Sequence, residues 1–188
     1  MIKESLDKMA SCPDTHFSLL SKVISGGQTG ADQGGLEAAK ILGLETGGYI
    51  PYGFLTSEGP RPDLKDSFNL TELPPMNLSK AYIQRSKMNV DQSQGTLVFR
   101  FKASSGTDKT IGYCYTRQWI QPHGYYENVY RPVYIVDSFN VRHIPYIRNW
   151  LSHYKISILN IAGHRASPDL PDFQAQVRNF LLLALSNG

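Results

Sequence analysis

Residues 22–35, KVISGGQTGADQGG, give the clearest indication of the fold class. It begins with a short apolar run, passes through a glycine-rich turn and opens a segment with helical periodicity. Lys22 to Ser25 predicts a buried strand, and Asp32 to Leu42 predicts a helix with an acidic residue in its first turn. A strand, a glycine turn and a helix in this order are typical of the repeating unit of a parallel α/β sheet.

The rest of the chain continues this alternation. Strands are predicted at Thr46 to Ile50, Gly95 to Phe101, Pro132 to Val136 and Lys155 to Ala162. Helices are predicted at Ser79 to Val90, Asp108 to Ile120, Ile144 to Tyr154 and Phe173 to Leu185. Because such elements pair in parallel through right-handed crossovers, we expect a single three-layer α/β domain with a mainly parallel sheet. We assign it to residues 21–188, after an N-terminal extension at residues 1–20.

One long proline-bearing stretch, from Pro51 to Asn77, interrupts the alternation. Irregular segments of this length are uncommon unless they are functional or disordered. This one contains more apolar side chains than a free linker needs. We therefore expect a loop that packs over the domain.

Composition narrows the classes of function. The 19 Lys and Arg against 16 Asp and Glu leave a net charge of +3, which is too small for the basic face of a double-stranded nucleic-acid binder. Cys12 and Cys114 are too few for a disulfide scaffold or a Cys-rich zinc site, so we expect no metal site and a reducing, cytoplasmic setting. No run approaches the ~20 apolar residues of a membrane span, so we expect no membrane partner.

The glycine-rich turn is the first candidate for a binding site. Gly26, Gly27, Gln28, Thr29 and Gly30 follow a predicted strand and precede a predicted helix. Glycine permits positive φ and close backbone approach, and the first turn of a helix presents unpaired N–H groups backed by its dipole. The turn therefore predicts an anion site, although it is neither a Walker A loop nor a GxGxxG fingerprint. The alternative is a tight strand-to-helix turn that binds nothing.

Two further loops follow predicted strands and would converge with it on one crevice. Ser105, Gly106 and Thr107 lie in the first of these loops. Gly163 and Arg165 lie in the second, where the arginine offers a planar donor fork to phosphate or carboxylate. The alternatives are helix capping by the hydroxyls and an ordinary surface ion pair for the arginine.

Three charged side chains could act beside these loops. Asp32 could cap its helix, orient a ligand hydroxyl or bind a hydrated cation. Glu58 could reach a ribose hydroxyl or be a solvated loop residue. Arg85 could offer charge to a phosphate.

These motifs together resemble a known family. The matching residues are Ile24 to Asp32, Thr46 to Gly48 with Pro51 and Gly53, Glu58 to Pro60, Arg85, Asn89 with Val90, Gly106 with Thr107, and Leu159 to Gly163 with Arg165. They closely resemble the putative molybdenum carriers, a family related to YpsA in the SLOG branch of Rossmann-like proteins. The resemblance spans about residues 22–187 and implies a Rossmann-like fold with a nucleotide or nucleotide-derived ligand at the strand-end loops.

The chain departs from the family pattern at several positions. Gln92 and Gln94 replace two carboxylates, and amides cannot act as general base or nucleophile. His164 stands where the family usually has proline. Tyr52 stands where the family often has a basic residue, so it exchanges charge for a surface on which a base can stack. The glutamate that assists glycosidic cleavage in the related LOG enzymes is absent, which disfavours that chemistry.

The sequence therefore predicts a domain that binds a small phosphate-bearing ligand, such as an ADP-ribose-like or signalling nucleotide. The expected ligand-binding residues are Gly26, Gly27, Gln28, Thr29, Gly30, Asp32, Tyr52, Glu58, Arg85, Asn89, Ser105, Gly106, Thr107, Gly163 and Arg165. One alternative is a carrier of molybdenum cofactor or molybdate, and another is a nucleotide N-glycosidase or hydrolase; no catalytic residue is assigned. Related proteins commonly associate, so we expect a homodimer. The Tyr-rich segment 122–132 is expected to form an aromatic flap or an interface.

Overall fold

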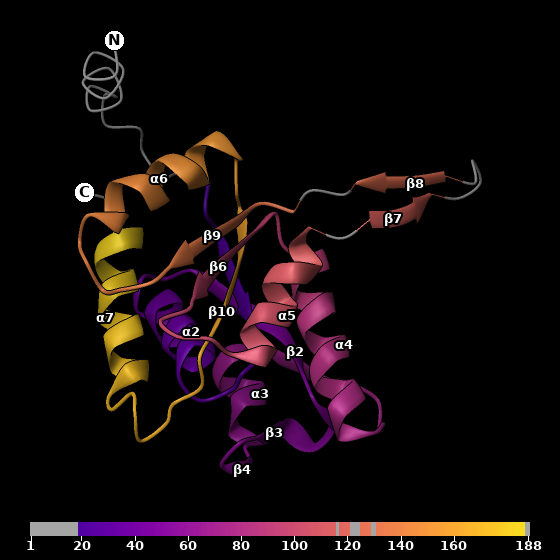
Figure 1. Cartoon of the computed structure of the whole chain (residues 1–188). Helices are drawn as coiled ribbons and strands as arrows, with labels where there is room; N and C mark the ends of the chain where they lie inside the picture. The colour runs from indigo at the N-terminus through magenta and orange to yellow at the C-terminus, as the bar shows by residue number, and fades with distance from the viewer. Residues whose placement is uncertain (1–18, 116, 121–124, 129–130, 187–188) are drawn as a thin grey trace, which may run out of the picture.

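A parallel sheet of six strands lies at the centre of the computed structural model, which describes residues 19–115, 117–120, 125–128 and 131–186 (Figure 1). The strand order is β5-β2-β1-β10-β6-β9. These strands are β1 (Lys22–Ser25), β2 (Glu45–Ile50), β5 (Leu70–Glu72), β6 (Gly95–Phe99), β9 (Val133–Val136) and β10 (Ile158–Gly163). Every neighbouring pair is parallel, which confirms the predicted α/β class.

Helices cover both faces of this sheet, so the fold has three layers (Figure 1). One face carries α2 (Ala31–Ile41), α6 (His143–His153) and α7 (Phe173–Leu185). The other face carries α4 (Leu78–Asp91) and α5 (Ser105–Cys114). Strands buried on both faces read as continuous apolar runs, and all five residues of β6 are accordingly buried.

Aromatic rings pack under the helices of the first face. Phe99 of β6 lies with its ring centroid 5.9 Å from that of Phe180 and 6.1 Å from that of Phe139. Trp150 of α6 and Phe173 of α7 belong to the same buried cluster. This core fixes β6 and β10, whose carboxyl ends carry two of the predicted loops.

The segment between Pro51 and Asn77 packs over the domain as expected, but it is not a plain loop. It contains η1 (Tyr52–Phe54), β3 (Leu55–Thr56), β4 (Gly59–Pro60), α3 (Asp63–Phe68) and the edge strand β5. Its Phe54, Leu64, Phe68 and Leu70 form a second buried cluster with side chains of α2 and β2. The prediction missed β5 because three residues are too few to show a period.

The predicted helix from Asp108 to Ile120 is wrong beyond Cys114, where α5 ends. Arg117–Ile120 instead forms β7, which pairs with β8 (Tyr125–Asn128) in an antiparallel hairpin that extends away from the sheet (Figure 1). Aromatic and β-branched residues, such as those in this segment, favour a strand. Apolar spacing that fits a helix was therefore not sufficient to predict one beyond Cys114.

Two predictions fall largely outside the described part of the chain. The N-terminal extension lies at residues 1–20, of which 1–18 are outside it. The aromatic flap includes residues 121–124 and 129–130, which are also outside it. Among the helices that the structure describes, none combines the length and apolar character needed to cross a membrane.

Candidate functional site

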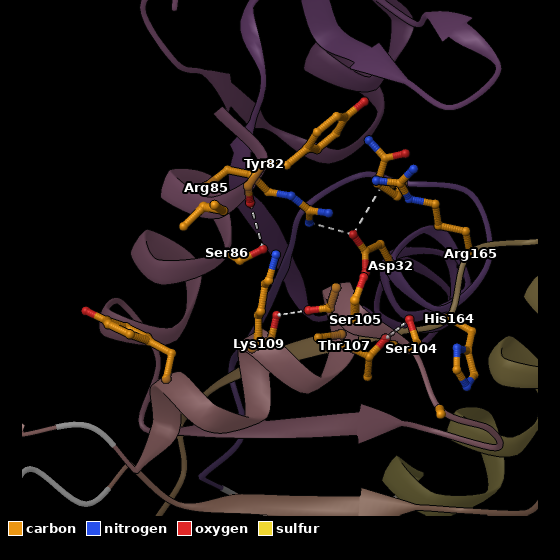
Figure 2. Close-up of a pocket in the computed structure, with 18 of the residues that line it drawn as sticks. Asp32, Tyr82, Arg85, Ser86, Ser104, Ser105, Thr107, Lys109, His164 and Arg165 are labelled. Atoms are coloured by element: carbon orange, nitrogen blue, oxygen red, sulfur yellow. Dashed lines mark hydrogen bonds and ion pairs between the residues drawn. The ribbon is translucent and has the colours of Figure 1, made fainter. Parts of the chain in front are cut away.

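A pocket of about 870 Å³ opens between α4 and α5, at the carboxyl ends of β1, β6 and β10. Asp32 and Gln28 contribute from the β1–α2 turn, and α4 contributes Tyr82 and Arg85. Figure 2 shows Asp32 and Arg85 meeting at the centre of the pocket, with Arg165 beside Tyr82 and with Lys109 rising from α5. The convergence of strand-end loops expected from a doubly wound sheet is therefore present.

Asp32 occupies the N-terminal end of α2 with its own negative charge. Its Oδ2 accepts a hydrogen bond from the Gln28 N–H at 3.2 Å and another from Arg85 Nη1 at 2.7 Å. Both side chains of this ion pair are largely buried, with exposed fractions of 5% for Asp32 and 13% for Arg85. The carboxylate thus takes the place that an external anion would occupy.

Two further N–H groups of the β1–α2 turn are engaged within the chain. The Gly30 N–H donates to Gln174 Oε1 at 3.2 Å, and the Ala31 N–H donates to the His164 carbonyl at 3.0 Å. The guanidinium of Arg85 lies on Gly26, where a Cβ atom would come within 1.1 Å of Nη1. Contacts within the chain therefore occupy part of this turn, including the space above Gly26.

The N-terminus of α5 has free donors. Ser105, Gly106 and Thr107 line the pocket, and no acceptor among the described residues receives their N–H groups. The N-cap residue Ser104 makes no side-chain cap, although its own N–H donates to Asp108 Oδ2 at 3.3 Å. Three unpaired N–H groups at the positive end of a helix dipole are suited to bind an anion.

Cationic side chains line the same pocket as these donors. Lys109 and Arg165 line the pocket, and neither forms an ion pair with a carboxylate that the structure describes. The guanidinium carbon of Arg165 lies 4.9 Å from the ring centroid of Tyr82, a cation–π contact that holds it beside the pocket. Lys102 also lines the pocket and pairs with Asp169 at 3.0 Å.

A salt bridge supports the start of α5 from behind. Arg100 Nε donates to Asp108 Oδ1 at 2.5 Å. The guanidinium holds the pKa of the Asp108 carboxyl below its ordinary value. Asp108 therefore stays ionised at neutral pH and remains an acceptor for the Ser104 N–H.

The predicted site residues fall into two groups. Those that line the pocket are Gln28, Asp32, Arg85, Ser105, Gly106, Thr107, Gly163 and Arg165. Those that do not line it are Gly26, Gly27, Thr29, Gly30, Tyr52, Glu58 and Asn89.

Residues of the second group make contacts within the chain. Asn89 is buried, and its amide accepts from the Tyr49 N–H at 2.8 Å and donates to the Tyr49 carbonyl at 3.2 Å. A Cβ atom on Gly27 would meet Leu70 and Ile50 of the second buried cluster. The Thr29 hydroxyl hydrogen-bonds the Ser57 hydroxyl at 3.1 Å. Gly27 and Thr29 therefore join the first turn to the segment after β2, whereas Asn89 joins α4 to β2.

Tyr52 and Glu58 are exposed residues of the segment after β2. Tyr52 has an exposed fraction of 56% in the short helix η1. The Glu58 N–H donates to Thr56 Oγ1 at 3.2 Å. A role in ligand binding for either residue stays a prediction.

Several lining residues were not predicted. Tyr82 and Ser86 lie one helical turn apart on α4, and Lys109 lies one turn after Ser105 on α5. Residues three and four apart share one face of a helix, so the positions of Arg85 and Ser105 were a usable signal for Tyr82 and Lys109. Ser86 directly follows Arg85, so this spacing did not indicate it.

The family positions with amides lie away from the pocket. Gln94 Oε1 accepts from the N–H groups of Ser157 and Ile158 at 2.8 and 2.7 Å, where β10 begins. Gln92 lines a second pocket of about 400 Å³ at that same end of the sheet, together with Lys22 and Ile158. The amides therefore leave the chemistry of the larger pocket unchanged. Among the described residues, no three His, Cys, Asp or Glu side chains lie together as a metal site.

Comparison with known proteins places this geometry in context. The sequence model of the circularly permuted YpsA SLOG family matches residues 23–185. A crystal structure of a "putative molybdenum carrier protein" from Syntrophus aciditrophicus is similar, with a TM-score of 0.71 and 29% sequence identity. That similarity covers 89% of this chain and 96% of the other. No curated protein matches the chain.

Proposed function

The chain belongs to the circularly permuted YpsA SLOG family, and we propose that its larger pocket binds a nucleotide or nucleotide-derived ligand through a phosphate. The observation that carries the proposal is the free N-terminus of α5. Ser105, Gly106 and Thr107 offer three unpaired N–H groups there, and Lys109 and Arg165 line the same pocket. Helix dipole, backbone donors and fixed cations favour the same kind of group, a phosphate or another oxyanion.

The binding arrangement differs from the one expected from the sequence. We assign the phosphate to α5 because Asp32 already fills the end of α2. Asp32 then serves the opposite part of the ligand. Its Oδ1 has no donor among the described residues, so it can accept from a hydroxyl of a sugar. Arg85 Nε is buried without a partner and would donate to the same part of the ligand.

The size of the pocket suits this class of ligand. A volume of about 870 Å³ lies in the upper part of the range of about 300–1,000 Å³ found for small-molecule sites. The ring of Tyr82 and the side chain of Ile83 supply apolar surface from α4. A base, a sugar and phosphates together need such a mixture of apolar and polar walls.

The direct test is a screen by thermal shift, followed by calorimetry, over nucleotides, cyclic dinucleotides and compounds derived from NAD. We expect at least one phosphate-bearing compound to bind and to raise the melting temperature. Lys109→Ala should weaken the best binder about tenfold, because one charge-assisted hydrogen bond is lost. Lys80→Ala, an exposed residue of α4 outside the pocket, is the matched control. Absence of any binder at millimolar concentration contradicts the proposal.

The second candidate function is carriage of molybdenum cofactor or molybdate. The name of the similar Syntrophus protein favours it, and the donors at α5 fit an oxyanion or the phosphate of a pterin cofactor. In that case Ser105 to Thr107 and Lys109 would hold the anionic group. Metal analysis of protein purified from molybdate-fed cells tests this candidate: stoichiometric molybdenum supports it, and traces far below one atom per chain reject it.

A further inference from the structure

His164 lines the pocket together with its neighbours Gly163 and Arg165, at the junction of three loops. Only 5% of its surface is exposed. Figure 2 shows its ring below Arg165, turned away from the centre of the pocket. Neither the proposed binding mode nor the ion pair of Asp32 uses this side chain.

The imidazole of His164 fastens the loop that leads into α5. Its Nε2 accepts hydrogen bonds from the N–H groups of Phe101 and Lys102, at 2.9 and 3.1 Å. A ring nitrogen that accepts carries no proton, so this geometry requires the neutral ring with its hydrogen on Nδ1. Ser104 and the free donors of α5 follow within a few residues.

The backbone of His164 joins two further segments. Its N–H donates to the Phe99 carbonyl at 3.1 Å, and its carbonyl accepts from the Ala31 N–H at 3.0 Å. One residue therefore links the ends of β6 and β10 with the start of α2. A change in its side chain acts on the loop between β6 and α5, while the backbone contacts stay.

The surroundings of the ring favour its neutral form. Burial, and after it the charges of Lys102 and Arg100, lower the pKa of His164 below its ordinary value, and Asp108 opposes them. From α7 the uncharged ring of Phe173 faces it, with centroids 6.1 Å apart. A proton on Nε2 would point at the N–H groups of Phe101 and Lys102. It would also add a positive charge near the charged side chains of Lys102 and Arg100.

We propose that His164 is a positioning residue of the ligand pocket: as a neutral acceptor it holds Phe101 and Lys102, and uptake of a proton releases them and weakens ligand binding. The inference about affinity rests on the proposed function. The inference about the loop does not, because the two backbone N–H groups can be observed without a ligand.

Amide hydrogen exchange tests the loop directly. In the unmodified protein, we expect exchange at Phe101 and Lys102, corrected for the intrinsic rate, to rise about tenfold between about pH 7.5 and about pH 5. His164→Gln should flatten this dependence, since an amide oxygen can accept but does not titrate. His164→Leu should raise exchange at both values of pH. His153→Gln, a change of an exposed residue on α6, should behave as the unmodified protein does.

Pyrophosphate binding, measured by calorimetry at the same two values of pH, tests the effect on the pocket. The dissociation constant at about pH 5, divided by that at about pH 7.5, should be about tenfold larger for the unmodified protein than for His164→Gln. Because both proteins meet the same probe at each pH, protonation of pyrophosphate itself affects both quotients equally. Equal quotients in the two proteins would overturn the inference. So would amide exchange at Phe101 and Lys102 that changes neither with pH nor in His164→Leu. If the two amides respond as expected but no phosphate compound binds, the inference about the loop is supported and the proposed function is contradicted.

Discussion

At the residue scale, the ion pair of Asp32 and Arg85 joins the start of α2 to α4 within the pocket. Each was expected in the site from its motif, and both line the pocket. The sequence did not indicate that they pair with each other, because they lie 53 residues apart. Nor did it indicate that Gly27 faces the apolar cluster of Leu70 and Ile50, since a glycine motif does not tell which side of the backbone is buried.

The buried pair predicts strong coupling between Asp32 and Arg85. Asp32→Asn leaves the guanidinium without its charge partner, so we expect a loss of about 3 kcal/mol in the free energy of unfolding. Arg85→Met should cost a similar amount. The double variant should lose clearly less than the sum, because no unpaired charge is left buried. Urea unfolding of the four proteins measures the cycle, and simple additivity would contradict the coupling.

Gly27→Val should destabilise the fold rather than act only on ligand affinity. Gly27 has a φ of 72°, and a Cβ there would lie 2.7 Å from Leu70 Cδ1. Strain and overpacking together should cost about 3 kcal/mol. At Gly112, inside α5, a Cβ meets nothing within 4 Å, so Gly112→Ala should stabilise by about 0.5 kcal/mol. Thermal unfolding compares the two, and equal melting temperatures would refute this assignment.

At the element scale, short apolar runs were sufficient to predict the strands of the sheet interior. The prediction of β1 at Lys22–Ser25 is confirmed to the residue, and so is α7 at Phe173–Leu185. The strand β5 was missed, and α5 was extended into β7. Both errors occur where tertiary pairing decides the structure: β5 forms because it pairs with β2 at the sheet edge.

Helix α4 carries one wall of the pocket and begins at a side-chain cap. Asn77 Oδ1 accepts from the N–H groups of Ser79 and Lys80 at 3.0 and 3.4 Å. Asn77→Ala should lower the free energy of unfolding by about 1 kcal/mol, and Asn77→Asp should restore most of it. Chemical denaturation measures both. Equal stability of the alanine and aspartate variants would contradict the capping role.

At the scale of the whole molecule, the meeting of three loops at one edge of the sheet followed from topology. Parallel strands end at the same edge, so the loops after β1, β6 and β10 had to lie close together. Which loop keeps free donors did not follow. It depends on side chains distant in sequence, such as Gln174 on Gly30 and Arg85 on Asp32, whose reach appears only in the folded chain.

Global stability should fall with acidification in two separate ranges. The pKa of His164 is lowered in the folded state, so below about pH 6.5 the unfolded chain binds a proton more readily than the folded chain. The free energy of unfolding therefore falls as the pH falls below this value. Asp63, Asp108 and Asp137 also have lowered pKa values, but the stability that their ionised carboxylates contribute is lost only near and below pH 3.8. Urea unfolding across pH should show a steeper loss between about pH 6.5 and 5 in the unmodified protein than in His164→Gln. Identical slopes would contradict the account.

In the proposed binding mode, a ligand phosphate binds at the start of α5 and not in the glycine turn after β1. Backbone amide chemical shifts, followed by NMR during titration with the best nucleotide of the screen, distinguish the two places. We expect the largest shifts at Ser105, Gly106 and Thr107, with smaller ones at Gly27 to Gly30. Largest shifts in the glycine turn, with α5 unmoved, would contradict it.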